Sequence, residues 1–118
     1  MFRYYNANPE LNDVEDCTIR AISVAEGISW DEAYIKLCRF ARLRGLMISS
    51  VASIERYLDD NFKRINTECE LVGEFAKNHT DGVYLITMKG HITVLKDGII
   101  YDTFNPSERL IKNVWRVR

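Results

Sequence analysis

The sequence predicts an α+β fold, in which N-terminal helices pack on a C-terminal antiparallel β-sheet. Helix-type spacing of apolar residues fills the first half of the chain, up to about Leu58. From Gly82 onward the sequence is rich in Val, Ile, Thr, Tyr and Phe, as strands are. The chain has 118 residues, is 47% hydrophobic and contains no linker, repeat or low-complexity segment, so we expect one domain over residues 1–118.

The first expected helix runs from about Cys17 to Glu26 and ends at Gly27. Asp16, which precedes it, is a residue type that caps helix N-termini, and residues 1–15 indicate an irregular arm. Apolar residues cover most of the circumference of this helix, which is typical of a central, buried one. These residues are Ile19, Ala21, Ile22, Val24 and Ala25.

Two further helices are expected before the sheet. Ser29 and Glu32 form a capping box, and the apolar stripe behind them predicts a helix that ends at Gly45. A third helix is expected over residues 51–58, with Ser50 as its cap. The stripe of the second helix consists of Trp30, Ala33, Tyr34, Leu37, Cys38 and Ala41.

The second half of the chain predicts mostly strands. Residues 62–65 indicate a short strand, and residues 71–79 one or two helical turns. The dipeptide Asp97-Gly98 between two β-type runs predicts a hairpin, and the alternation in residues 113–118 indicates a last strand.

Composition narrows the class of function. The formal net charge of −1 argues against a nucleic-acid or membrane-surface partner, and no apolar stretch approaches the ~18 residues of a membrane span. The first residues lack the apolar core of a signal peptide, and three widely spaced cysteines favour free thiols, so we expect a cytoplasmic location. Without a Cys-x-x-Cys pair we expect no zinc site, and no other cofactor is implied.

Cys17 has the sequence context of a reactive thiol. At the first position of a helix, unpaired N–H groups stabilise a thiolate and lower the pKa of the cysteine, although the charge of Asp16 opposes this. A cysteine nucleophile also needs a base and a group that orients the base. The chain offers two histidines: His79 in a polar loop and His91 at the start of a β-run.

The register of the predicted hairpin decides which residue lies beside His91. If Asp97-Gly98 forms a two-residue turn, Thr93 lies opposite Asp102. His91 and Asp102 are then diagonal neighbours on one face, with backbones about 7–8 Å apart. A three-residue turn would instead bring Asn105 to the His91 side. The Asp-Gly dipeptide favours the first register, so we expect Asp102 as the orienting residue and keep Asn105 as the alternative.

Two boxes carry a resemblance to a known family. "DCTIRAIS" and "GHITVLKDGIIYDTFNPS" resemble the papain-like cysteine peptidase fold. More narrowly, they resemble small phage and bacterial proteins with an Asp-Cys-x-x-Arg-Ala box and a Gly-His…Asp-Gly…Tyr-Asp-Thr box. Bacteriocin-leader peptidases attached to export transporters look like more distant relatives. The similarity spans about Tyr4 to Trp115 and implies a Cys–His–Asp/Asn triad of Cys17, His91 and Asp102, with Cys17 at the head of the central helix.

The sequence departs from that family at the oxyanion hole. Papain-like enzymes usually carry a Gln five or six residues before the cysteine, whereas this chain has Leu11 and Asn12 there and contains no Gln. The amide of Asn12 or of Asn8 is the candidate replacement, and the backbone N–H of Cys17 is a second donor. Because loss of one donor typically costs ~10²–10³ in rate, the departure predicts a slow enzyme or a non-catalytic relative.

Simpler interpretations exist for most of these residues. Cys17 is alternatively a small buried hydrophobic side chain, as we expect for Cys38. Cys69 is expected to be a loop or edge residue, and His79 a solvated loop histidine. Arg20 is expected to have a structural role, pairing with an acid such as Asp16 or anchoring the N-terminal arm.

Three functions therefore remain open. The first is a small intracellular thiol hydrolase that cleaves a peptide or isopeptide bond in a protein or peptide substrate. The second is a catalytically weak or inactive papain-like module of phage origin that binds a host or phage protein. The third is a structural phage or mobile-element protein in which the fold is a relic. The sequence does not indicate the substrate or the oligomeric state.

Overall fold

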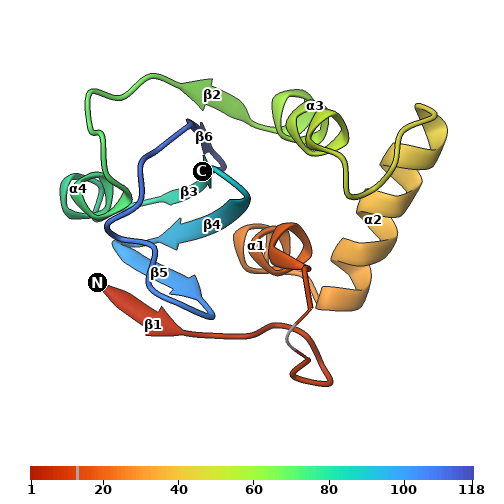
Figure 1. Cartoon of the computed structure of the whole chain (residues 1–118), viewed down its shortest axis with the longest axis horizontal. Coiled ribbons are helices and arrows are strands. Elements are labelled where there is room, and N and C mark those ends of the chain that lie inside the picture. Colours follow the sequence, from red (N-terminus) through yellow and green to blue (C-terminus); the bar gives the residue numbers. More distant parts are fainter. Residues whose placement is uncertain (13) are drawn as a thin grey trace.

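Helices and strands combine in one α+β fold, as the sequence predicts (Figure 1). The computed structural model describes residues 1–12 and 14–118. Its elements are β1 (Phe2–Tyr4), α1 (Cys17–Glu26), α2 (Trp30–Leu43), α3 (Val51–Asn61), β2 (Lys63–Ile65), α4 (Val72–Asn78), β3 (Val83–Met88), β4 (His91–Lys96), β5 (Ile99–Asp102) and β6 (Asn113–Arg116).

Local signals in the sequence fix the helix ends. Gly27 ends α1 in a left-handed conformation with φ of 66°, which glycine adopts without steric cost. At the start of α2, the Ser29 hydroxyl accepts from the Glu32 backbone N–H, and the Glu32 carboxylate accepts from the Ser29 N–H, so the predicted capping box is present. Helix α3 begins as predicted after Ser50 and continues about one turn further than predicted, to Asn61.

The C-terminal strands β3 to β6 pair antiparallel, as predicted, but the N-terminal strand β1 makes the sheet as a whole mixed. Its six strands lie in the order β1-β5-β4-β3-β6-β2, and β1 pairs in parallel with β5. The expected irregular arm therefore contributes an edge strand, which the backbone N–H of Tyr5 extends by donating to the carbonyl of Asp102 at 2.8 Å. Three strand residues are too few to show a period in the sequence, which explains why β1 was not predicted.

Helices cover both faces of the sheet, with α4 on one side and α1, α2 and α3 on the other (Figure 1). Every residue of β3 is buried, because successive side chains point to opposite faces of the sheet and helices cover both faces. Val83 and Leu85 pack in the cluster that contains α1, whereas Tyr84 and Ile86 pack in the cluster that contains α4.

The two hairpins place His91 and Asp102 at the same end of the sheet. Lys96 pairs with Ile99, so Asp97 and Gly98 form the two-residue turn of the favoured register. At the preceding turn Met88 pairs with His91, which makes His91 the first residue of β4, while Asp102 is the last residue of β5.

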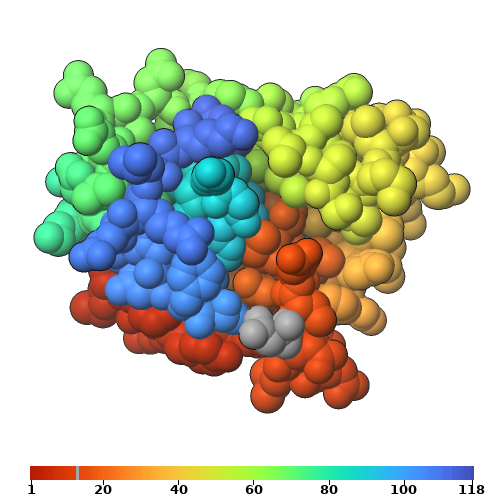
Figure 2. All heavy atoms as spheres, in the orientation of Figure 1, coloured from red at the N-terminus to blue at the C-terminus, as the bar shows by residue number. Residues whose placement is uncertain are grey.

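The N-terminal segment lies along β5 on the surface (Figure 2). In the described part of the chain, no helix has both the length and the apolar character needed to cross a membrane.

Candidate active site

Cys17 is the first residue of α1 and is partly buried. Asp16 occupies the N-cap position, as predicted, but its side chain makes no capping hydrogen bond to the first turn. The carboxylate instead accepts from Trp30 Nε1 at 2.8 Å and from Asn8 Nδ2 at 3.3 Å, and it pairs with Arg20. The N–H groups of a first helical turn have no partner within the helix. Since the Asp16 side chain does not accept from them either, these N–H groups remain uncapped next to the Cys17 thiol.

His91 and Asp102 meet as the hairpin register predicts. His91 Nε2 lies 2.7 Å from Asp102 Oδ2, and both side chains are more than nine-tenths buried. The second carboxylate oxygen, Oδ1, accepts from the backbone N–H of Thr103 at 2.7 Å, which fixes the carboxylate plane. The imidazole also lies against the Phe104 ring, with centroids 4.6 Å apart. The ring of His91 is therefore held in place by a carboxylate and an aromatic side chain.

Cys17 and His91 come together from distant parts of the sequence. Burial raises the pKa of the Cys17 thiol. Hydrogen bonds with the His91 ring and the Ile92 backbone lower it, as do the charges of His91 and Arg20. The lowering effects together outweigh burial, so the net shift of the pKa is downward. Because Nε2 of His91 is taken by Asp102, Nδ1 is the ring nitrogen left for the thiol.

The pKa of His91 is raised and that of Asp102 is lowered. Burial lowers the pKa of His91, but hydrogen bonds with Asp102 and Cys17 raise it, and the net effect is a pKa of about 9. Burial raises the pKa of Asp102, but the hydrogen bond with His91 lowers it, and the net shift is downward. Relative to the ordinary pKa values, these directions favour the charged form of each group: the thiolate, the imidazolium and the carboxylate.

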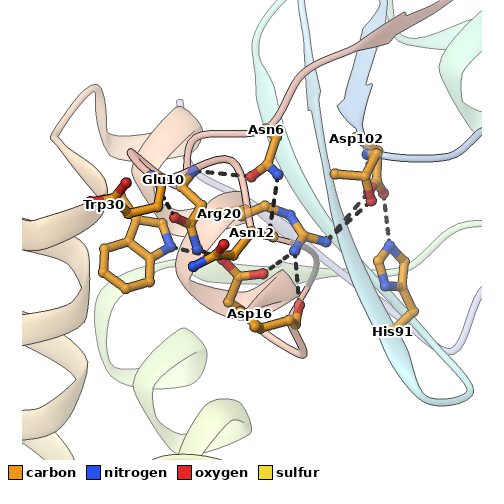
Figure 3. A network of polar contacts seen from close by, with 11 residues as sticks. Asn6, Glu10, Asn12, Asp16, Arg20, Trp30, His91 and Asp102 are labelled. Carbon is orange, nitrogen blue, oxygen red and sulfur yellow. Dashed lines mark hydrogen bonds and ion pairs between the residues drawn. The ribbon is translucent and has the colours of Figure 1, made fainter.

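Arg20 connects this group to the start of α1 (Figure 3). Its guanidinium pairs with Asp16, lies 3.5 Å from the Thr103 hydroxyl and lies 3.9 Å from Asp102 Oδ1. The sequence predicts the pairing of Arg20 with Asp16 but not its contact with Asp102. That contact joins two residues 82 positions apart, and no local spacing in the sequence indicates it.

The alternative orienting residue and the two candidate oxyanion donors lie elsewhere. The Asn105 side chain accepts from the backbone and hydroxyl of Ser107, whereas the hydrogen bond with His91 is made by Asp102. The Asn8 amide donates to Asp16, and its oxygen accepts from a backbone N–H, so this side chain is used to build the loop before α1. Asn12 is exposed and its backbone carbonyl accepts from Asn6; its part in an oxyanion hole stays a prediction.

The other residues considered in the sequence lie outside this group. Cys38 and Cys69 are both partly buried free thiols. His79 lies in the loop after α4, as predicted, but is partly buried: its ring stacks on Phe75 with centroids 3.7 Å apart, and Nδ1 lies 2.9 Å from the Phe75 carbonyl. No cluster of three or more His, Cys, Asp or Glu side chains suited to a metal ion occurs within residues 1–12 and 14–118.

A hollow of about 280 Å³ is lined in part by Phe104, whose ring also contacts His91. The N-terminal segment forms one side of it and the chain after β5 forms the other, so Phe104 belongs both to the hollow and to the surroundings of His91. The residues that line it are Tyr4, Asn6, Leu11, Thr103 and Phe104.

No family model, curated protein or solved structure matches the chain.

Proposed function

We propose that the protein is a papain-like thiol hydrolase that cleaves a peptide or isopeptide bond, with Cys17 as nucleophile, His91 as general acid and base, and Asp102 as the residue that orients His91. The observation that carries the proposal is the juxtaposition of these three side chains. A helix N-terminus supplies the thiol, and two paired strands supply the imidazole and its carboxylate.

Acylation begins from the charged pair. The Cys17 thiolate attacks the carbonyl carbon of the substrate, a C–S bond forms, and the π electrons move to the carbonyl oxygen. When the tetrahedral intermediate collapses, the C–N bond breaks and His91 Nδ1 gives its proton to the departing amine. The products of this half-reaction are a free amine, a thioester on Cys17 and a neutral His91.

Deacylation restores the enzyme. His91 Nδ1 accepts a proton from water as the water oxygen attacks the thioester carbon. The C–S bond then breaks, the acid product leaves, and the thiolate and imidazolium are regenerated. Asp102 stays ionised throughout, because the hydrogen bond that it accepts from Nε2 lowers its pKa, and its negative charge in turn stabilises the charged ring. The cycle needs water and the amide substrate and no metal or organic cofactor.

The developing oxyanion needs hydrogen-bond donors. The backbone N–H of Cys17 at the start of α1 is the donor that the geometry favours, because the Asp16 side chain does not cap the first turn. Asn12 is the candidate second donor, and the hollow bordered by Tyr4, Leu11 and Phe104 is the candidate site for a substrate side chain. We place the activity in the cytoplasm, where free thiols stay reduced.

The test is cleavage of a defined mixture of synthetic peptides, followed by mass spectrometry of both peptides and protein. We expect cleaved peptides and an acyl adduct on Cys17 for the wild type and for Cys69→Ala, and neither for Cys17→Ala. Cleavage that persists in Cys17→Ala would contradict the proposal.

A second candidate function is a papain-like module, of phage origin, that binds a host or phage protein without turnover. The observation that favours it is the use of the Asn8 amide within the loop, which leaves a side-chain oxyanion donor undemonstrated. If wild type and Cys17→Ala retain the same intact protein from a lysate with equal affinity, and neither cleaves it, this candidate replaces the hydrolase.

A further inference from the structure

We propose that Arg20 is a positioning residue of the Cys17–His91 site. Its guanidinium joins the start of α1 to the end of β5 and offsets the negative charge of Asp16 beside the thiol. The inference rests on the proposed function of Cys17 and His91, and it assigns to Arg20 a role beyond the structural one that its sequence position indicates.

The contacts of Arg20 reach both sides of the site (Figure 3). The side chain is 10% exposed. Nη1 pairs with Asp16, one residue before the nucleophile, and lies 3.4 Å from the Val14 carbonyl. Nη2 lies 3.5 Å from the Thr103 hydroxyl and 3.9 Å from Asp102 Oδ1. One planar cation thus contacts both the residue that precedes Cys17 and the residue that holds His91.

Asp16 transmits this positioning to the thiol. Besides Arg20, its carboxylate accepts from Trp30 at the start of α2 and from Asn8 in the N-terminal segment. Three segments of the chain, α1, the start of α2 and the N-terminal segment, therefore converge on Asp16, which is 5% exposed. Because Asp16 and Cys17 are consecutive, fixing Asp16 fixes the direction in which α1 presents its first side chain.

The same arrangement balances charge in a buried place. The charged groups near Cys17 are Asp16 and Arg20 from its own segment, His91 from β4 and Asp102 from β5. Without Arg20, two buried carboxylates would face a single imidazolium, and a buried charge without a partner is strongly unfavourable. The positive charge of Arg20 also acts directly on the thiol, whose pKa it lowers.

Two substitutions separate charge from geometry. Arg20→Met removes the charge and keeps an unbranched side chain. Arg20→Lys keeps the charge but not the planar fork that contacts two partners at once. Arg39→Met is the matched control, since Arg39 is an exposed arginine of α2. Thermal unfolding of each variant identifies the temperature range in which it is folded.

The readout is the rate at which iodoacetamide alkylates Cys17, measured by mass spectrometry from pH 4 to pH 10. We expect the pH midpoint of Arg20→Met to rise by about one unit, so that alkylation at pH values below both midpoints is roughly tenfold slower than in the wild type. Arg20→Lys should show a smaller rise in the same direction, and Arg39→Met none. A merely structural Arg20 would lower the unfolding temperature without moving the midpoint of the folded protein.

Unchanged midpoints in folded Arg20→Met and Arg20→Lys would overturn the inference. If Arg20→Met does not fold, Arg20→Lys decides alone: a raised midpoint supports the positioning role and an unchanged one refutes it. The alkylation profile needs no substrate, so its outcome is independent of peptide cleavage. A wild type with a low midpoint and no cleavage would refute the hydrolase proposal and leave the role of Arg20 intact.

Discussion

The two histidines lie in regions that share burial and an aromatic neighbour but differ in what else they contact. His79 stacks on Phe75 and meets a backbone carbonyl, between α4 and β3. His91 lies against Phe104 and meets the Asp102 carboxylate and the Cys17 thiol. Packing alone fixes the orientation of an imidazole. An imidazole that also contacts a carboxylate and a thiol has its charge set by them and can exchange a proton with the thiol.

The two regions should differ most in how much the loss of their histidine slows peptide cleavage. His91→Ala should slow peptide cleavage by roughly 10²–10⁴-fold, the usual contribution of a general acid and base. His79→Ala should leave cleavage close to the wild-type rate, because His79 contacts none of the three site residues. Steady-state rates of the two variants on one peptide provide the measurement, and equal losses would contradict the assignment.

Asp102→Asn tests the carboxylate that distinguishes the two regions. Burial lowers the pKa of His91, but the hydrogen bonds and charges of Asp102 and Cys17 together raise it to about 9, so an amide in place of Asp102 should lower that pKa. A fall of about one unit corresponds to a roughly tenfold change in the protonation equilibrium. Titration of the His91 ring by NMR measures this directly. A pKa unchanged by the substitution would show that Asp102 does not control the ring.

The raised pKa of His91 also predicts how stability depends on pH. A group with a raised pKa in the folded state stabilises the protein below its ordinary value and loses that contribution as pH rises through the folded value. The contribution of His91 should therefore be complete below pH 6.5 and decline as pH rises through about 9. Urea unfolding of wild type and His91→Ala at pH 6, 8 and 10 should give free-energy differences that shrink with pH. A difference that grows over this range would contradict the shift.

The smallest expected effect on the site comes from the His79 region. Phe75 is fully buried against β3, so Phe75→Leu should lower the free energy of unfolding by roughly 1–3 kcal/mol. Alkylation of Cys17 at pH 6 should keep its wild-type rate, because no contact joins Phe75 to the thiol. Urea unfolding and alkylation of one preparation measure both quantities. A slowed alkylation in the folded variant would show that the two regions are coupled.

Local patterns in the sequence predict the parts of this structure that depend on neighbouring residues. The capping box at Ser29, the end of α1 at Gly27 and the turn at Asp97 and Gly98 each follow from residues a few positions apart. The hairpin register places Asp102 beside His91 by counting alone. These features follow from backbone geometry that the local side chains determine.

Local patterns in the sequence do not predict contacts between distant segments of the chain. The parallel pairing of β1 with β5 leaves no period in three residues, and the side chain of Asp16 turns from the helix end toward Arg20, Trp30 and Asn8. Residue type predicts that Asp16 occupies a cap position. Only the packing of α1 against its neighbours decides which donors its carboxylate accepts from.

The central claim is that Cys17 and His91 form a charged pair, and the pH dependence of Cys17 reactivity tests it most directly. Alkylation rates from pH 4 to pH 10 in wild type and His91→Ala should give a wild-type midpoint below 9.0, the ordinary thiol pKa, and a higher midpoint without the imidazole. A wild-type midpoint near 9.0 that His91→Ala leaves unchanged would contradict the claim.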